Sequence, residues 1–97
     1  MMDDRDAGTL RLDSLRREID ELDLEILDLL QRRMALVEQI ASLKRQAGVE
    51  VQDVAREDAI FRRLAREAQT PLSPQAVERI FGEILKVSRE LQSRWSD

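Results

Sequence analysis

The longest uninterrupted helical pattern in the chain is the feature that most limits its fold. Between Leu12 and Ala47 there is no Gly or Pro, and apolar residues recur at the three- and four-residue spacing of a helix face. Gly48 follows where a helix C-cap is expected, and either Thr9 or Asp13 suits the N-cap. The pattern predicts one helix beginning near Leu12. Its apolar stripe consists of Leu12, Leu15, Ile19, Leu22, Ile26, Leu29, Leu30, Val37, Ile40 and Ala41.

Two shorter helices are predicted after this segment. Asp53 suits the N-cap of the first, and residues 49–52 before it form a short connection with no partner strand. Thr70-Pro71-Leu72 predicts a turn, and Ser73-Pro74 predicts the next helix start, because Pro at the first helical position lacks an amide hydrogen that would have no partner. The expected buried faces are Ala55, Ile60, Phe61, Leu64 and Ala68 on the second helix, and Val77, Ile80, Phe81, Ile84, Leu85, Leu91 and Trp95 on the third.

The length of the first helix decides the expected architecture. At 1.5 Å per residue, residues 12–47 would extend about 54 Å, whereas a compact chain of 97 residues has a radius of gyration of about 13 Å. Two shorter helices cannot cover both ends of such a rod, so its apolar stripe must pack on a second molecule, most simply a symmetric copy. We therefore expect an all-α fold with a very long first helix in an interlocked homodimeric bundle. Residues 1–8 are expected to be a mobile tail, and 9–97 a single domain.

Composition excludes several kinds of chemistry. The chain has no Cys and no His, which removes disulfides, thiol nucleophiles, Ser-His triads and a histidine acid or base. Sixteen basic and twenty acidic residues give a net charge of −4, which disfavours non-specific binding to nucleic acid. No apolar run approaches the roughly 20 residues of a membrane span, and the first residues lack a signal peptide's apolar segment. We expect a cytoplasmic protein that does not bind membranes.

Polar residues interrupt the predicted core faces. Arg33 and Lys44 are eleven residues apart, so they differ by only about 20° around the helix and frame one stripe. Ser88 and Gln92 are four apart and continue the third helix's core face. Singly, each has an ordinary explanation: the cations can extend to water, and the stripe can fray near the C-terminus. Together they suit a small dianion carrying hydroxyl and ether oxygens.

Two further polar segments have the same double interpretation. Asp53-Val54-Ala55-Arg56-Glu57 opens the second helix, where capping and first-turn acid are common structural uses. Arg16 lies beside the apolar stripe of the first helix and, taken alone, is an ordinary surface arginine.

The order and separation of these residues resemble the all-helical chorismate mutase family from about Leu12 to Arg94. That family forms dimers of three-helix chains whose long first helices pair. The resemblance is carried by Leu15-Arg16-x-x-Ile19-Asp20-x-Leu22-Asp23, Leu29-Leu30-x-Arg32-Arg33, Lys44, Asp53-x-x-Arg56-Glu57 and Ser88-x-x-x-Gln92.

The resemblance implies an isomerase that rearranges chorismate to prephenate in phenylalanine and tyrosine biosynthesis. The reaction is intramolecular and pericyclic, so it requires no covalent intermediate, no cofactor and no metal. The protein must hold the ether side chain over the ring and stabilise the negative charge that develops on the ether oxygen.

The resemblance also implies a role for each residue. Arg33, and Arg16 from the other subunit, would each hold a substrate carboxylate, for which the planar guanidinium is suited. Lys44 would contact a carboxylate and the ether oxygen, and the amide of Gln92 would donate to that same oxygen. Glu57, helped by the backbone at Asp53, would accept a hydrogen bond from the ring hydroxyl. Ser88 and Arg56 would complete the contacts to the carboxylates.

Two other interpretations stay open at this stage. An isochorismate pyruvate-lyase can use the same scaffold with similar Arg and Lys contacts. A non-catalytic helical dimerisation module, or a regulatory domain for another shikimate-pathway enzyme, would need no polar site. The complete set of polar residues argues against an inactive module, although an active enzyme could still associate or be fused with such a partner.

Overall fold

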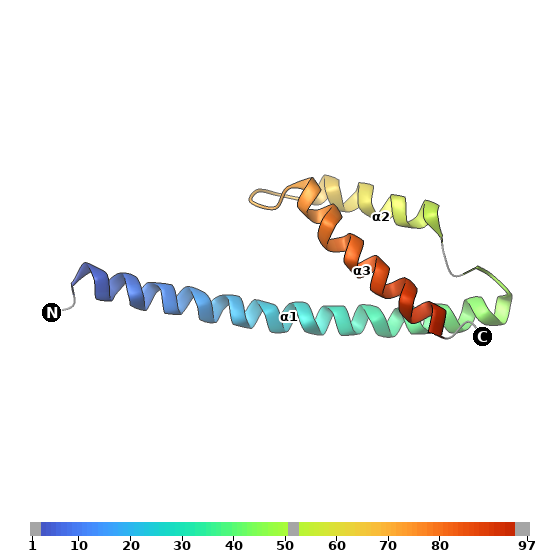
Figure 1. Ribbon diagram of the computed structural model, residues 1–97, viewed down its shortest axis with the longest axis horizontal. Coiled ribbons are helices and arrows are strands. Elements are labelled where there is room, and N and C mark those ends of the chain that lie inside the picture. The colour runs from blue at the N-terminus through green and yellow to red at the C-terminus, as the bar shows by residue number, and fades with distance from the viewer. Residues whose placement is uncertain (1–2, 51–52, 95–97) are drawn as a thin grey trace. The chain divides into compact units, whose positions relative to one another are not determined.

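The computed structural model describes residues 3–50 and 53–94, and within them it contains three helices and no strand (Figure 1). They are α1 (Asp4–Ala47), α2 (Val54–Glu67) and α3 (Pro74–Arg94). The predicted all-α class and the very long first helix are confirmed. Trp95, expected on the third helix, and residues 51–52 of the predicted connection lie outside the described residues. None of the three helices is long and apolar enough to cross a membrane over the part of the chain described.

The start of α1 differs from the prediction. The helix begins at Asp4, and the side chain of Asp3 accepts a hydrogen bond from the Asp6 amide at 2.9 Å, as an N-cap does. Thr9 lies inside the helix, where its hydroxyl donates to the carbonyl of Arg5 at 3.0 Å. The predicted caps, Thr9 or Asp13, are therefore wrong. The apolar periodicity begins later than the helix because acidic residues favour the first turn without contributing to a core.

The chain divides into two units, residues 1–33 and 34–97. Residues 4–33 form only helix, and most apolar side chains of the predicted stripe are exposed there. The exposed fraction is 39% at Leu15 and reaches 58% at Leu29, while Leu30 is half-buried. Helical propensity alone leaves an isolated helix marginal in water. This segment therefore supplies apolar surface for packing but has no core of its own.

Residues 34–94 have a small core to which all three helices contribute. Its buried apolar residues are Val37 and Ala41 of α1, Ile60 of α2, and Val77 and Leu85 of α3. Helices α2 and α3 pack against each other and are joined by the turn at 68–73, where the Leu72 amide donates to the Gln69 carbonyl (Figure 1).

Two residues predicted on the buried faces of α2 and α3 are exposed, namely Ala55 and Ile80. Each precedes a buried residue of its own helix, Ile60 or Leu85, by five positions. Five residues rotate the helix by about 140° beyond a full turn. Ala55 therefore lies well away from the buried face of α2. Ile80 is also three residues, or about 60°, from the buried Val77, so it lies at the edge of the buried face of α3. The prediction that both are buried is wrong.

The predicted helix ends in this region are confirmed. Gly48 has φ 69°, a left-handed conformation that favours glycine, and ends α1. The Asp53 carboxylate accepts from the Arg56 amide at 2.9 Å, and the Ser73 hydroxyl accepts from the Ala76 amide at 3.0 Å. These caps fix Lys44 in the last turn of α1 and Glu57 in the first turn of α2.

Candidate active site

One short segment of α3, residues 88–92, contacts both other helices of the 34–94 unit. Gln92 meets Lys44 at the end of α1, and Arg89 meets Glu57 at the start of α2. Arg89 and Gln92 are three residues apart and therefore neighbours on one helix face. The structure thus brings four polar side chains from three helices to one end of α3.

The contact between Lys44 and Gln92 has a defined direction. The Lys44 ammonium donates to Oε1 of Gln92 across 3.4 Å, and both residues are partly buried. An ammonium group has only donors, so it must face the amide oxygen. The Gln92 side chain consequently directs its amide nitrogen, with two donor hydrogens, away from Lys44. Each residue therefore has donor hydrogens beyond the one in this contact.

Ser88 is buried, with 4% of its surface exposed. Its hydroxyl donates to the Ile84 carbonyl at 2.8 Å, and its oxygen lies 3.6 Å from the Met34 sulfur. A buried polar group needs a hydrogen-bond partner, and Ser88 has one. The Ser88 hydroxyl could donate to a substrate carboxylate only after its hydrogen rotated away from the Ile84 carbonyl.

The first turn of α2 holds the remaining predicted residues of this unit. Asp53 caps the helix and is exposed, and Arg56 is exposed and bonds to it through its backbone amide. Glu57 is partly buried, and its carboxylate accepts from the Arg89 guanidinium at 2.5 Å. The structural interpretation of Asp53 as a cap is therefore confirmed, whereas any role in binding stays a prediction.

Arg89 was missed by the sequence analysis. It lies between Ser88 and Gln92 in the chain, and its side chain is 35% exposed in the ion pair. The available signal was its spacing of three from Gln92, which puts both side chains on one face. Nothing in the sequence indicated that Glu57, on another helix, would be its partner.

Arg16 and Arg33 belong to the unit of residues 1–33, where Arg16 is exposed and Arg33 is partly buried. Both lie on α1, seventeen residues apart, a separation of about 26 Å along the axis. This distance is too great for the two arginines of one chain to hold the same small dianion. If both serve such a ligand, they must come from different chains.

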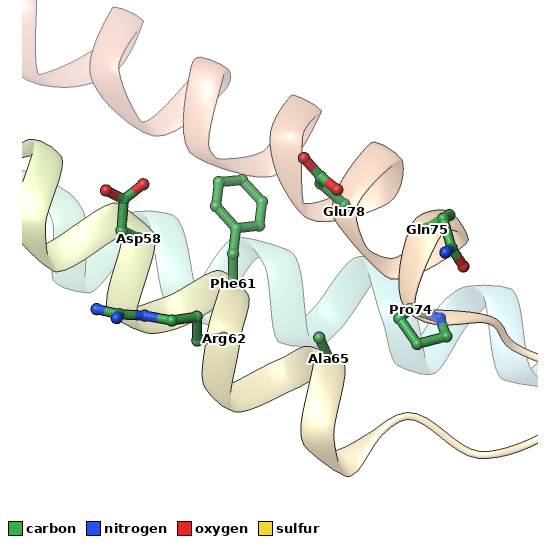
Figure 2. A pocket seen from close by; sticks show the side chains of 7 residues that line it. All are labelled: Asp58, Phe61, Arg62, Ala65, Pro74, Gln75 and Glu78. Atoms are coloured by element: carbon green, nitrogen blue, oxygen red, sulfur yellow. The ribbon is translucent and has the colours of Figure 1, made fainter.

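A separate hollow of about 440 Å³ lies between α2 and α3. Figure 2 shows Phe61 of α2 pointing toward α3, between Asp58 on its own helix and Glu78 on α3. Two carboxylates and the single guanidinium of Arg62 give the lining a net negative charge, which suits a dianion poorly. None of the eight predicted site residues lines this hollow, which is made by Asp58, Phe61, Arg62, Ala65, Pro74, Gln75 and Glu78. Over residues 3–50 and 53–94, no group of three or more His, Cys, Asp or Glu could hold a metal ion.

Two proteins of known name are similar to the chain in sequence. The chorismate mutase of Methanocaldococcus jannaschii is 36% identical over 56 residues, 58% of this chain and 57% of that protein. The bifunctional chorismate mutase/prephenate dehydratase of Aquifex aeolicus is 36% identical over 87 residues, 86% of this chain and 24% of that protein. The matched part therefore spans a little over half of one relative and about a quarter of the other.

Solved structures give more extensive matches. Chorismate mutase (form II) from Thermus thermophilus has a TM-score of 0.85 and 34% identity, covering 87% of this chain and 96% of that one. Chorismate mutase from Helicobacter pylori in complex with prephenate has a TM-score of 0.80 and 32% identity, covering 87% and 91%. The family model described as chorismate mutase type II matches residues 15–93, a range that contains every predicted site residue. The chain therefore belongs to the chorismate mutase type II family.

Proposed function

We propose that the protein is an isomerase that rearranges chorismate to prephenate. Family membership and the prephenate in the similar Helicobacter pylori structure support this substrate and product. The rearrangement breaks the C–O bond of the ether side chain and forms a C–C bond to the ring within one molecule. The chain then needs to hold the reactive geometry and to stabilise charge on the ether oxygen, so it needs no nucleophile and no added cofactor.

The contact between Lys44 and Gln92 carries the proposal. An incoming ether oxygen would replace the Gln92 oxygen beside the Lys44 ammonium, and the Gln92 amide, once turned, would donate to the same atom from its nitrogen. Two donors then approach the atom on which negative charge grows. At 3.4 Å the existing contact is long, so a ligand oxygen can replace it at little cost.

The remaining groups would hold the other parts of the substrate. Glu57 would accept from the ring hydroxyl, beside the backbone at Asp53, and its position in the first turn of α2 supports a fixed orientation. Ser88 would complete a carboxylate contact by redirecting its hydroxyl hydrogen. The exposure of Arg56 supports a contact through water.

The complete site requires a homodimer. Arg33 would hold a substrate carboxylate in the site of its own chain. Arg16 would reach into that site from the partner subunit and hold a substrate carboxylate too. The distance of about 26 Å between them on one helix supports this division. The exposed apolar stripe of residues 4–33, including Leu22, Ile26 and Leu29, supplies surface that pairing of two first helices would bury.

The Aquifex aeolicus relative joins a chorismate mutase to a prephenate dehydratase. Association or fusion with another enzyme of the shikimate pathway therefore remains part of the proposal for this chain. A cytoplasmic location stays a prediction from the sequence.

The test is an assay of purified protein with chorismate and, separately, with isochorismate, without added metal or cofactor. Wild type should produce prephenate from chorismate. Lys44→Ala should lower kcat/KM by about 10²–10³-fold, the effect of removing one preorganised donor to a developing charge. Lys86→Ala removes the same charge from an exposed position on α3 and should retain activity.

The other outcomes separate the competing functions. Pyruvate release from isochorismate without prephenate formation would establish the lyase. A folded protein inactive on both substrates would support the non-catalytic module. Normal activity in Lys44→Ala would remove the assigned site while leaving the reaction in place.

A further inference from the structure

The ion pair between Glu57 and Arg89 joins the two helices that the proposed site uses for the ring hydroxyl and the ether oxygen. Glu57 is in the first turn of α2, and Arg89 is three residues before Gln92 on α3. The Glu57 side chain is only 20% exposed, and Arg89 donates to its Oε1. The pair is therefore partly shielded from water, unlike the exposed pair between Arg32 and Asp28 on α1.

A carboxylate at Glu57 creates an electrostatic problem for the proposed substrate. Chorismate carries two carboxylates, so the negative charge of Glu57 would oppose its binding. Glu57 nevertheless has to accept a hydrogen bond from the ring hydroxyl, which requires an acceptor fixed in position. Both requirements are met if a neighbouring cation compensates the charge and occupies one of the two carboxylate oxygens.

We propose that Arg89 is a positioning residue that neutralises Glu57 and fixes its second oxygen, Oε2, toward the substrate's ring hydroxyl. The contact at Oε1 leaves Oε2 as the acceptor, and a carboxylate offers both oxygens in one plane. Arginine suits this role because its charge persists at every working pH and its guanidinium is rigid and planar. The inference rests on the proposed reaction, because the hydroxyl is a feature of that substrate.

The expected effect is on substrate binding. The ring hydroxyl is on the carbon next to the breaking C–O bond but takes no part in the bonds that break and form, so we expect its contact with Glu57 to serve the ground state and the transition state alike. Loss of such an interaction raises KM and leaves kcat nearly unchanged. Arg89→Gln should raise KM by about 10- to 100-fold, the range for losing a hydrogen bond to a charged group.

A double-mutant cycle tests the mechanism. In Glu57→Gln the charge is gone and an amide oxygen can still accept from the hydroxyl, so adding Arg89→Gln should change KM by less than about twofold. Arg89→Lys keeps the charge without the planar group and should recover part of the lost affinity. Arg79→Gln is the matched control, because it removes the same charge from an exposed position about 15 Å earlier on α3 and should leave KM unchanged.

Measurements of kcat, KM and the thermal midpoint for all five variants distinguish the possible results. An unchanged KM in Arg89→Gln would overturn the inference. So would an equal rise of KM when Arg89→Gln is made in wild type and in Glu57→Gln, because Arg89 would then bind substrate directly. A lower midpoint with unchanged KM would assign Arg89 a structural role only. Wild-type protein that fails to rearrange chorismate would overturn the proposed reaction together with this inference, whereas active wild type with a normal Arg89→Gln overturns the inference alone.

Discussion

The two units of the chain have similar helical sequence patterns but different uses for their apolar residues. Residues 34–94 bury Val37, Ala41, Ile60, Val77 and Leu85 within one chain. Residues 4–33 have a regular stripe of large apolar residues, yet Ile19, Leu22 and Ile26 are each more than half exposed. Periodicity predicts that a helix has an apolar face, but it does not tell whether the partner for that face belongs to the same chain.

The strongest way to break this comparison is to place a charge on the exposed stripe. Leu22→Asp should prevent self-association if the stripe is the dimer interface. An uncompensated buried charge costs about 3 kcal/mol or more, and a symmetric dimer contains two, so association should weaken by about 10⁴-fold. Analytical ultracentrifugation over a concentration series measures this change, and activity should fall with the dimer fraction.

The control for this substitution is Gln31→Asp. Nine residues separate positions 22 and 31, so they lie on opposite sides of α1. The same carboxylate at the exposed position 31 should leave self-association unchanged. A dimer that persists in Leu22→Asp would show that the stripe is not the interface, and a monomeric wild type would remove the shared site altogether.

The next largest effect concerns the chemistry of the 34–94 unit. Gln92→Glu replaces an amide that donates at any ordinary pH with a carboxylate that donates only when protonated. Near pH 7.5 the carboxylate should repel the developing charge, and activity should fall by about 10²–10³-fold. As the pH falls toward the pKa of the introduced carboxyl group, the donor returns and activity should rise.

The measurement is a pH profile of kcat, normalised to folded protein by circular dichroism at each pH. Wild type should stay comparatively flat over the same range. Gln75→Glu introduces a carboxylate at an exposed position of the same helix and should follow wild type. Activity in Gln92→Glu that equals wild type at neutral pH, with no gain on acidification, would show that Gln92 does not contact the ether oxygen.

A third experiment asks whether the two units serve one site from different chains. Arg16→Ala and Lys44→Ala proteins are mixed under conditions that exchange subunits. A mixed dimer then has one intact site, with Arg16 from one chain and Lys44 from the other, while the second site carries both changes. Half of the dimers are mixed, and each has one of two sites working, so about a quarter of wild-type activity should return.

Exchange is verified independently by native mass spectrometry, for which the two variants differ in mass. Either variant alone, taken through the same exchange procedure, should recover no activity. No recovery despite complete exchange would assign Arg16 to its own chain's site or to no site.

The sequence determined more of the local structure than of the contacts between helices. Gly48, Asp53 and Ser73 act within a few residues of themselves, so their chemistry alone predicted the ends of three helices, and the structure confirmed them. The start of α1 was missed because Asp3 caps it through polar contacts that leave no apolar pattern.

Contacts between helices depend on side-chain direction, which spacing describes only coarsely. Ile80 was placed on the buried face, but it lies at the edge of that face, about 60° around the helix from Val77, and half of its surface is exposed. Ser88 and Gln92 were identified because polar residues interrupted an apolar stripe. The partnership of Arg89 with Glu57 followed from the packing of α2 on α3, which no local pattern encodes.

The smallest expected effect distinguishes a structural cap from a residue that also positions the site. Ser73 and Asp53 each cap a helix of the 34–94 unit through one side-chain hydrogen bond, at 3.0 and 2.9 Å respectively. Ser73→Ala and Asp53→Ala should each lower the free energy of unfolding by about 1 kcal/mol. Urea denaturation at one fixed protein concentration measures both, because the stability of the proposed dimer would depend on concentration.

Only Asp53→Ala should also affect catalysis, because the turn that it caps carries Glu57. A frayed first turn would leave that carboxylate less well fixed, and since its contact serves ground and transition states alike, KM should rise while kcat stays near wild type. Ser73→Ala should keep both constants within about twofold, as expected for a substitution away from the site. Equal stability losses with equal KM values would mean that Asp53 is a cap and nothing more. A KM change confined to Asp53→Ala would instead show that this cap determines where the substrate's hydroxyl partner lies.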